Sequence, residues 1–163
     1  MTYATPTALR IALEQRLLNE SNDSGISLDR LRRRVIFERV VSRLEAADPG
    51  HWVLKGGMAL EVRLRDEARL TKDIDLGLRD TIDDGEELHE RLVEALATDP
   101  FSDGFVITAE PVTQLAEDNA GQVTWRSRLE ASLGGRPFGR VQLDAWPGVT
   151  SLRTPNLCRS RTP

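Results

Sequence analysis

The chain of 163 residues has few cysteine, histidine and aromatic side chains. Its one cysteine, Cys158, cannot form a disulfide within the chain, which favours a reducing compartment. Its two histidines, His51 and His89, lack metal-ligand spacing, so each is expected to be structural or exposed. No Ser/His/Asp or Cys/His arrangement is visible, and nucleophilic catalysis of those kinds is therefore not indicated.

Long apolar runs are also missing. No stretch approaches the roughly 20 apolar residues that a membrane-spanning helix needs. The first residues, 1–6, contain no basic region followed by an apolar one, so no secretory signal is expected. Hydrophobic residues make up 39% of the chain and charged residues 29%, as in an ordinary globular protein. We therefore expect a cytoplasmic protein.

Charge is unevenly distributed along the chain. The formal net charge is -4, yet residues 151–163 hold three arginines and no acid, so the body is more acidic than the total suggests. An acidic body argues against a broad electrostatic grip on nucleic acid. The basic run Arg30, Arg32, Arg33 and Arg34 could form a local patch, but we expect it to be the solvated face of a helix.

The length favours one domain, because a domain of about 150 residues buries roughly 70% of its unfolded surface. We predict that residues 1–150 form this domain. Residues 151–163 have no hydrophobic periodicity, two prolines and an arginine bias. We predict that they form a disordered tail, which resembles the product of a frameshift or truncation.

Two helices are predicted ahead of the first strand. The first spans Thr7 to about Asn19, because the turn-forming stretch 19–25 should end it. The second begins after Ser27, a good N-cap, and stops at 48–50. Its inward positions, which fall near helical spacing, are expected to be Leu28, Leu31, Val35, Val41 and Leu44.

The remainder predicts an α+β fold, in which a mixed β-sheet is flanked by helices. The strand candidates are 51–54, 73–78, 105–110, 122–133 and 138–146. The last two should form a hairpin through 134–137. Further helices are expected over 58–65 and 86–98, the latter with Leu88, Leu92, Val93 and Leu96 facing inward.

The most informative stretch runs from Leu54 to Leu76. A Lys55-Gly56-Gly57 turn follows the first strand, and its glycines let backbone N–H groups approach an anion closely. The helix expected from Met58 would aim its positive N-terminal end at the same point, which suits a triphosphate. A P-loop is not supported, because no Gly-x-x-x-x-Gly-Lys-Ser/Thr is present.

A pair of carboxylates follows on the next predicted strand. Successive side chains on a strand point to opposite faces, so Asp73 and Asp75 share one face while Ile74 and Leu76 face the core. Mg²⁺ is usually held by one or two carboxylates together with substrate phosphates. The pair is therefore a candidate magnesium site.

Asp144 is the candidate third carboxylate. It lies near the end of a strand in which apolar residues alternate with it, so its face is set apart from the core. If this strand lies beside the Asp73 strand, three carboxylates converge and could hold the two cations of an in-line displacement at phosphorus. Lys55 or Arg69 could supply positive charge to the phosphoryl oxygens, and Thr71 a hydroxyl contact.

Each feature alone is weak, because each has an ordinary structural explanation. Gly-Gly pairs are more often turns than sites. Asp144 could be a solvated strand end, Lys55 and Arg69 exposed surface charge, and Thr71 a residue of simple strand propensity. The order of strand, Gly-Gly turn, helix and acidic strand favours a nucleotide-and-metal site over these alternatives.

At these residues the chain resembles the AbiEii-type nucleotidyltransferases. These are toxin components of bacterial toxin-antitoxin and phage-defence systems, within the polymerase-β-like nucleotidyltransferase superfamily. The resemblance covers roughly residues 25–148, and its carriers are 54–60, 69–76 and 140–144. It implies a nucleotidyltransferase-type fold.

The resemblance also implies roles for single residues. Gly56 and Gly57 match the glycines that hold the nucleotide triphosphate, Asp73 and Asp75 match the metal ligands, and Asp144 matches the third acid. The implied reaction transfers a nucleotide from an NTP, with Mg²⁺, to an RNA acceptor such as the tRNA 3′ end. A cognate antitoxin protein is the implied partner.

One departure from the family leaves alternatives open. Members usually continue into a helical C-terminal half that carries further active-site residues, and this chain stops first. A second hypothesis is therefore a truncated, catalytically inactive remnant or interaction module that retains the fold. A third is a plain nucleic-acid-binding domain with salt-sensitive RNA binding, which the acidic body disfavours.

Overall fold

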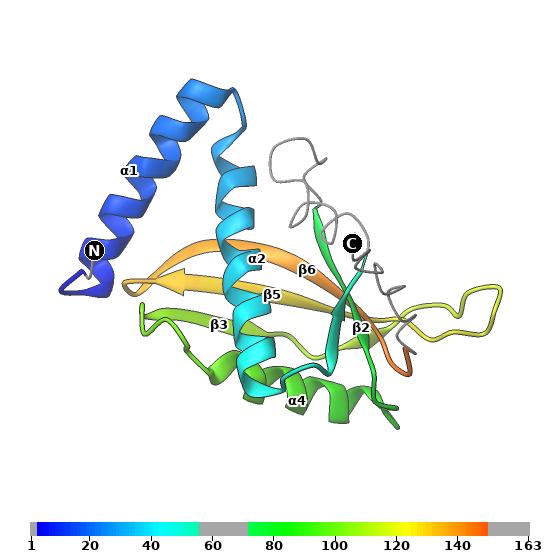
Figure 1. Cartoon of the computed structure of the whole chain (residues 1–163). Helices are drawn as coiled ribbons and strands as arrows, with labels where there is room; N and C mark the ends of the chain where they lie inside the picture. The colour runs from blue at the N-terminus through cyan, green and yellow to red at the C-terminus, as the bar shows by residue number, and fades with distance from the viewer. Residues whose placement is uncertain (1–2, 56–71, 150–163) are drawn as a thin grey trace, which may run out of the picture.

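The computed structural model describes residues 3–55 and 72–149. In these ranges a six-stranded mixed sheet has helices packed on one face, which confirms the predicted α+β class (Figure 1). Its strands are β1 Trp52–Leu54, β2 Asp73–Leu78, β3 Phe105–Ala109, β4 Thr113–Gln114, β5 Trp125–Leu133 and β6 Arg136–Trp146. Its helices are α1 Pro6–Ser24, α2 Leu28–Ala47 and α4 Gly85–Ala97. None of the helices in these ranges has the length and apolarity of a membrane span.

Helix α1 is longer than predicted. The hydroxyl of Thr5 accepts from the Ala8 N–H at 3.1 Å and begins the helix, with a proline in its first turn. The polar stretch expected to end it at Asn19 instead continues as helix to Ser24. The stop is Gly25, whose left-handed backbone (φ 73°) donates its N–H to the Ser21 carbonyl.

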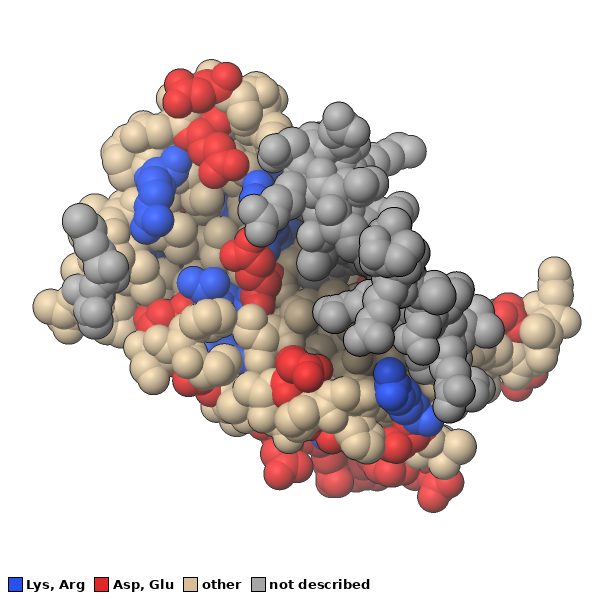
Figure 2. Space-filling view, viewed as in Figure 1, with Lys and Arg blue, Asp and Glu red and all other residues tan. Residues whose placement is uncertain are grey.

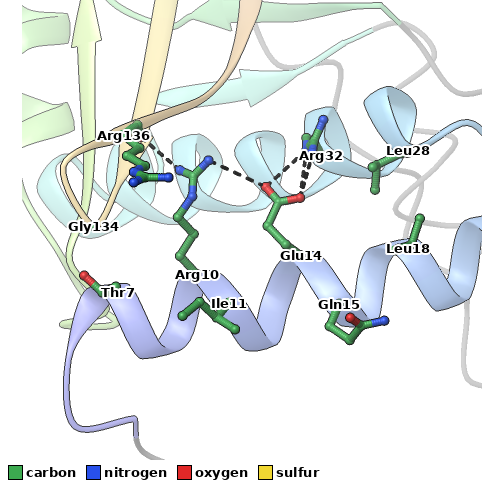
Figure 3. Close-up of a pocket in the computed structure, with 10 residues that line it drawn as sticks. All are labelled: Thr7, Arg10, Ile11, Glu14, Gln15, Leu18, Leu28, Arg32, Gly134 and Arg136. Atoms are coloured by element: carbon green, nitrogen blue, oxygen red, sulfur yellow. Dashed lines mark hydrogen bonds and ion pairs between the residues drawn. The ribbon is translucent and has the colours of Figure 1, made fainter.

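Helix α1 is fixed to the end of the β5–β6 hairpin by Arg10 (Figure 3). The guanidinium of Arg10 donates to the carbonyls of Leu133, Arg136 and Pro137 at 2.9 to 3.1 Å. One turn later, Glu14 binds Arg32 of α2 at 2.7 Å. These contacts hold α1 to both of its neighbours.

Helix α2 begins at the predicted N-cap, where the Ser27 hydroxyl accepts from the Arg30 N–H. Of the predicted apolar positions, Leu31 and Leu44 are buried, and Leu28, Val35 and Val41 are partly buried and pack against the core. The buried side chains are Leu31, Ile36, Phe37, Val40, Arg43 and Leu44. The buried face is therefore wider than the predicted one.

The arginine run of α2 does not form a free basic patch. Arg32 pairs with Glu14, Arg33 with Asp29 at 3.1 Å, and Arg34 with Glu20 at 3.6 Å. The predicted solvated face holds for Arg34, which is exposed, whereas Arg32 and Arg33 are partly buried. Acidic side chains gather along the lower edge of the molecule, over α4, where the glutamates of that helix are exposed (Figure 2).

Helix α4 begins at Asp84, whose carboxylate accepts from the Glu87 N–H at 2.9 Å. Its buried residues are Leu88, Leu92, Ala95 and Leu96. The inward orientation predicted for Val93 is wrong, because its side chain is 47% exposed. Ala95 occupies the inward position because it completes the i, i+3, i+4 spacing with Leu88 and Leu92.

The sheet has the order β1-β2-β6-β5-β3, with β4 pairing to β5. Strands β2 and β6 run parallel, and the other paired strands run antiparallel. Strands β5 and β6 form the predicted hairpin, but its turn is only Gly134-Gly135, with φ of 60° and 71°. Residues 136 and 137 therefore belong to β6 rather than to the loop. Strand β4 was not predicted, and β5 begins at Trp125 rather than 122.

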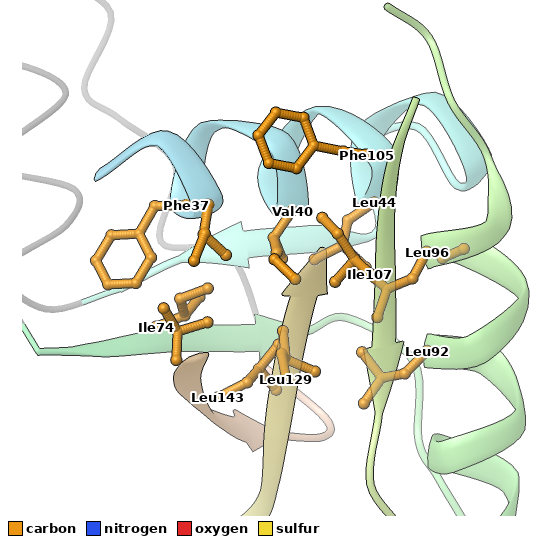
Figure 4. Packing of buried hydrophobic residues seen from close by; sticks show 14 of the residues in the cluster. Phe37, Val40, Leu44, Ile74, Leu92, Leu96, Phe105, Ile107, Leu129 and Leu143 are labelled. Carbon is orange, nitrogen blue, oxygen red and sulfur yellow. The ribbon is translucent and has the colours of Figure 1, made fainter. Parts of the chain in front are cut away.

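One face of the sheet forms the core with α2 and α4 (Figure 4). Ile74 of β2, Leu129 of β5 and Leu143 of β6 are at most 1% exposed there, against Val40 and Leu92 of the helices. Each such side chain contributes roughly 1.5–3 kcal/mol by leaving water. Because side chains alternate, this core fixes which residues of β2, β5 and β6 point to the opposite face.

Candidate metal and nucleotide site

The parallel pairing of β2 with β6 brings the predicted carboxylates together. Asp75 lies directly opposite Asp144, and Asp73 lies opposite Gln142. All four residues occupy the sheet face that points away from the core. The condition set by the sequence, that the Asp144 strand lie beside the Asp73 strand, is met.

The electrostatics of the three carboxylates agree with this proximity. Burial raises the pKa of Asp75, and the negative charges of Asp144 and Asp73 raise it further, while Arg126 acts in the opposite direction. Ionised Asp75 is therefore destabilised by its neighbours. A positive charge placed among these carboxylates would relieve the repulsion.

Arg126 on β5 supplies such a charge. It lies opposite Asp144, and it donates from Nε to Oδ1 and from Nη2 to Oδ2, each at 2.8 Å. With the Gln142 amide turned so that its oxygen faces the guanidinium, that oxygen also accepts from Nε and Nη2 at 3.0 and 3.1 Å. Hydrogen bonding to Asp144 is the main cause of a raised pKa at Arg126. Asp144 is only 8% exposed.

Lys55 lies on the same side of the sheet. Its N–H donates to the Asp75 carbonyl at 2.8 Å, and its ammonium is 5.6 Å from the centre of the Trp146 ring. The Lys55 side chain packs against Gly77 of β2. A Cβ at Gly77 would come within 3.1 Å of Lys55 Cε and 2.9 Å of Val149 Cγ2. The missing side chain at Gly77 therefore leaves room for the Lys55 side chain to cross β2.

Several predictions concern residues outside the described ranges. Gly56, Gly57, Arg69 and Thr71 are among them, as is the helix expected over 58–65. Their assigned roles stay predictions. The same holds for the division of the chain at residue 150 and for the disordered tail.

A second group of possible metal ligands consists of Asp48, His51 and Asp80, whose donor atoms lie within 4.8 Å of one another. His51 Nδ1 is 2.8 Å from Asp80 Oδ2, which agrees with a structural histidine. Arg91 Nη2 binds both Asp48 and Asp80, the latter at 2.6 Å. Arg91 thus occupies two of the three residues of this group, and a cation would have to replace it at both, so the group is better explained as a tie between α2, β1, β2 and α4.

Arg91→Ala tests this tie. The pKa of Asp80 is lowered, mainly by hydrogen bonds from Arg91 and then His51. Its stabilising contribution is therefore present above its unfolded pKa and is lost as pH falls through the folded pKa. We expect Arg91→Ala to lower the Tm by a few degrees at neutral pH and by less in acid.

The control for Arg91→Ala is Arg140→Ala, because Arg140 forms a far more exposed pair with Glu130. Its Tm should equal that of the wild type in thermal unfolding followed by circular dichroism. Equal losses in the two variants would contradict a special role for Arg91.

A mixed sheet that carries Asp73, Asp75 and Asp144 on the face opposite the core is the arrangement that the sequence predicts for a nucleotidyltransferase site. The family model "Nucleotidyl transferase AbiEii toxin, Type IV TA system" matches residues 39–157. The chain belongs to this family, which confirms the resemblance seen in the sequence. Lys55, Asp73, Asp75, Arg126 and Asp144 all lie within the matched region.

Comparisons with solved structures and with curated proteins do not extend this family assignment. A crystal structure of a proposed nucleotidyltransferase from H. pylori is similar to the chain at 20% sequence identity, with a TM-score of 0.44. The similarity covers 75% of this chain and 46% of that one, so the chain spans less than half the length of that relative. No curated protein gives a significant match.

Proposed function

We propose that the chain carries a metal-dependent nucleotidyltransferase site, formed by Asp73, Asp75 and Asp144. The observation that carries the proposal is the parallel β2–β6 register, which sets Asp75 opposite Asp144 within the region matched by the family. Two carboxylates on one strand would occur often by chance. A third that meets them from a distant segment is a much more specific arrangement.

The donor set fits a divalent cation such as Mg²⁺. Carboxylate oxygens are the ligands that Mg²⁺ prefers, and burial, followed by the negative charges of Asp144 and Asp73, raises the pKa of Asp75. When bound, the cation would neutralise phosphate oxygens and support displacement at phosphorus. We propose Asp73 and Asp75 as its main ligands.

The remaining residues would bind and position the nucleotide and the acceptor. Asp144 would serve as a third ligand or as the base that takes the proton of the acceptor hydroxyl. Lys55, on the same face, would contact phosphate oxygens, a role that Arg69 could share. Gly56 and Gly57 would cradle the phosphates through their backbone N–H groups, and Thr71 would add a hydroxyl contact.

For the substrates, we propose that a nucleotide passes from an NTP to an RNA, with the tRNA 3′ end as the first acceptor to test. The family description supports a toxin that works with an antitoxin. We therefore propose a cognate antitoxin protein as the partner. A reaction on NTPs and tRNA would take place in the cytoplasm, in agreement with the location expected from the sequence.

The test is transfer of labelled nucleotide from each of the four NTPs to total tRNA by the purified chain with Mg²⁺. We expect transfer from at least one NTP, and loss of it in Asp73→Ala and in the presence of a chelator. Absence of transfer from all four, or full transfer by Asp73→Ala, would refute the proposed activity of this chain.

The second candidate function is a non-catalytic interaction module that keeps the fold. The observation that favours it is the ion pair in which Arg126 already neutralises Asp144. On this hypothesis the pair is permanent, no transfer is detected, and the carboxylates bind no divalent cation. The transfer assay and the metal titration below separate the two candidates.

A further inference from the structure

We propose that Arg126 limits access of a divalent cation to the carboxylate site, because it holds Asp144 in an ion pair that the cation has to displace. The inference rests on the proposed function for the identity of the site. It concerns a residue of β5 that the sequence motifs leave out. Arg126 is thus a positioning residue for the metal ligands.

The ion pair engages both oxygens of Asp144. Arg126 approaches with two parallel N–H donors at 2.8 Å, the geometry in which a guanidinium matches a carboxylate most closely. A carboxylate bound in this way has fewer lone pairs left for a cation. Because Asp144 is 8% exposed, few other ligands can compete for it. In the chain as described, Asp144 is committed to Arg126 rather than available.

The guanidinium also lies beside the rest of the cluster. It is bonded to Asp144, which the β2–β6 register places directly opposite Asp75. A cation among the three carboxylates would sit in the same negative potential. Two positive charges cannot share it without repulsion, so binding of the cation and the Arg126–Asp144 pair exclude each other.

Arg126 is able to move without disturbing the fold. Its side chain is 41% exposed, whereas its strand neighbour Ser127 is buried on the core side. The hydroxyl of Ser127 donates to the Glu110 carbonyl at 2.7 Å and helps to fix the strand at this point. A rotation of the Arg126 side chain into solvent would therefore release Asp144 while β5 stays in register.

The expected consequence is a lowered affinity of the wild type for metal. If the site accepts a cation fully only when the pair is open, the apparent affinity is reduced by the fraction of molecules in the open state. Removing Arg126 should remove this reduction. Two hydrogen bonds to a largely buried carboxylate predict a change of about tenfold in Kd.

The experiment uses Mn²⁺ alone as the probe, titrated into the full chain and followed by calorimetry and by the electron paramagnetic resonance of free Mn²⁺. We expect Arg126→Ala and Arg126→Gln to bind Mn²⁺ about tenfold more tightly than the wild type at unchanged stoichiometry. Arg126→Lys should bind Mn²⁺ with an affinity between that of the wild type and that of these two variants, because lysine keeps the charge but cannot make the paired hydrogen bonds.

The matched control is Arg128→Ala. Arg128 lies on the same strand and face, two residues along, and pairs with Glu110 at 3.7 Å with 61% of its side chain exposed. Its removal deletes the same charge without freeing a ligand, and should change the Kd less than twofold. An equal gain of Mn²⁺ affinity in Arg128→Ala would mean that net charge alone causes the effect, and would overturn the proposal.

The remaining outcomes separate this inference from the proposed function. If Asp75→Asn abolishes Mn²⁺ binding but the Arg126 variants bind like the wild type, the metal site stands and the role of Arg126 falls. If no variant binds Mn²⁺, both fall. Should Arg126→Ala unfold, the Gln variant carries the test through a second readout, since Mn²⁺ should raise its Tm by more than it raises that of the wild type.

Discussion

Replacing Asp75 by asparagine is expected to abolish nucleotide transfer without destabilising the fold. Asparagine keeps the shape of the side chain but removes its charge, and with it one proposed metal ligand. Loss of such a ligand should lower the rate by roughly 10³-fold or more, because it weakens stabilisation of charge in the transition state. The measurement is single-turnover transfer of labelled nucleotide to tRNA at saturating Mg²⁺.

Although Asp75→Asn should lose activity, its thermal stability should be equal to or higher than that of the wild type. The folded pKa of Asp75 is raised, so the native state binds its proton more tightly than the unfolded chain does. Ionised Asp75 therefore lowers the stability of the wild type above its unfolded pKa, and this loss disappears as pH falls through the folded pKa. We expect the Tm of Asp75→Asn to equal or exceed that of the wild type at pH 7.5, with a smaller difference in acid.

The control for Asp75→Asn is Glu130→Gln. Glu130 lies on the same face of the sheet, pairs with Arg140 and is 47% exposed. Both its transfer rate and its Tm should match the wild type. Unimpaired transfer by Asp75→Asn would remove Asp75 from the site, and a large fall in Tm would mean that its role is structural.

The faces of the carboxylates could be predicted from the sequence, whereas their cationic partner could not. Strict alternation in β2 and near the end of β6 identifies the face of Asp73, Asp75 and Asp144. The position of Arg126 depends on the register of the β5–β6 hairpin. Counting back from the Gly134-Gly135 turn pairs residue 126 with 143, which lies on the core face.

A β-bulge is the reason for this shift. The register changes between Ala131 and Ser132, so that Ala131 pairs with Gly139 while Ser132 pairs with Pro137. The extra residue on β6 moves the partner of Arg126 from 143 to 144 and thereby to the carboxylate face. Pro137 and Gly139 are residue types typical of a bulge, and a Cβ at Gly139 would come within 2.9 Å of Ile36 Cδ1, but hydrophobic alternation alone does not reveal the change of register.

The predicted end of α1 and the predicted buried face of α2 differ from the structure for related physical reasons. The polar residues after Asn19 favour turns only weakly, and the helix continues until Gly25 can adopt the left-handed conformation that stops it. On α2, the spacing of apolar residues did not reveal that an arginine is buried. Arg43 lies at i+3 from Val40 and i+7 from Ile36, which places it on the core face.

Replacing Arg43 by alanine is expected to cause a large loss of stability, about 3–4 kcal/mol. The side chain is 3% exposed, and it donates to the carbonyl of Leu96 at 2.6 Å and to that of Phe105 at 2.7 Å. The first carbonyl belongs to the last turn of α4, which has no helical donor. The second belongs to the first residue of β3.

The cost follows from what the substitution leaves behind. Both carbonyls would lose their donor in a buried place, and the space of the guanidinium would be empty. Asp99, 3.5 Å from Arg43, would also lose its counter-charge. Since a domain is typically stable by only about 5–15 kcal/mol, such a loss would be evident in urea unfolding analysed by linear extrapolation.

Two comparisons make the Arg43 result specific. Arg43→Met retains most of the apolar volume but has no donors, so it should recover only the part of the loss due to the cavity. Arg30→Ala removes an exposed arginine of the same helix whose side chain has no hydrogen bond or ion pair within the described ranges, and it should change stability by less than about 0.5 kcal/mol. If Arg43→Ala were no less stable than Arg30→Ala, the link from α2 to α4 and β3 through these two carbonyls would carry little of the folding energy. The junction would then depend on apolar contacts such as those of Leu44, Leu92 and Leu96.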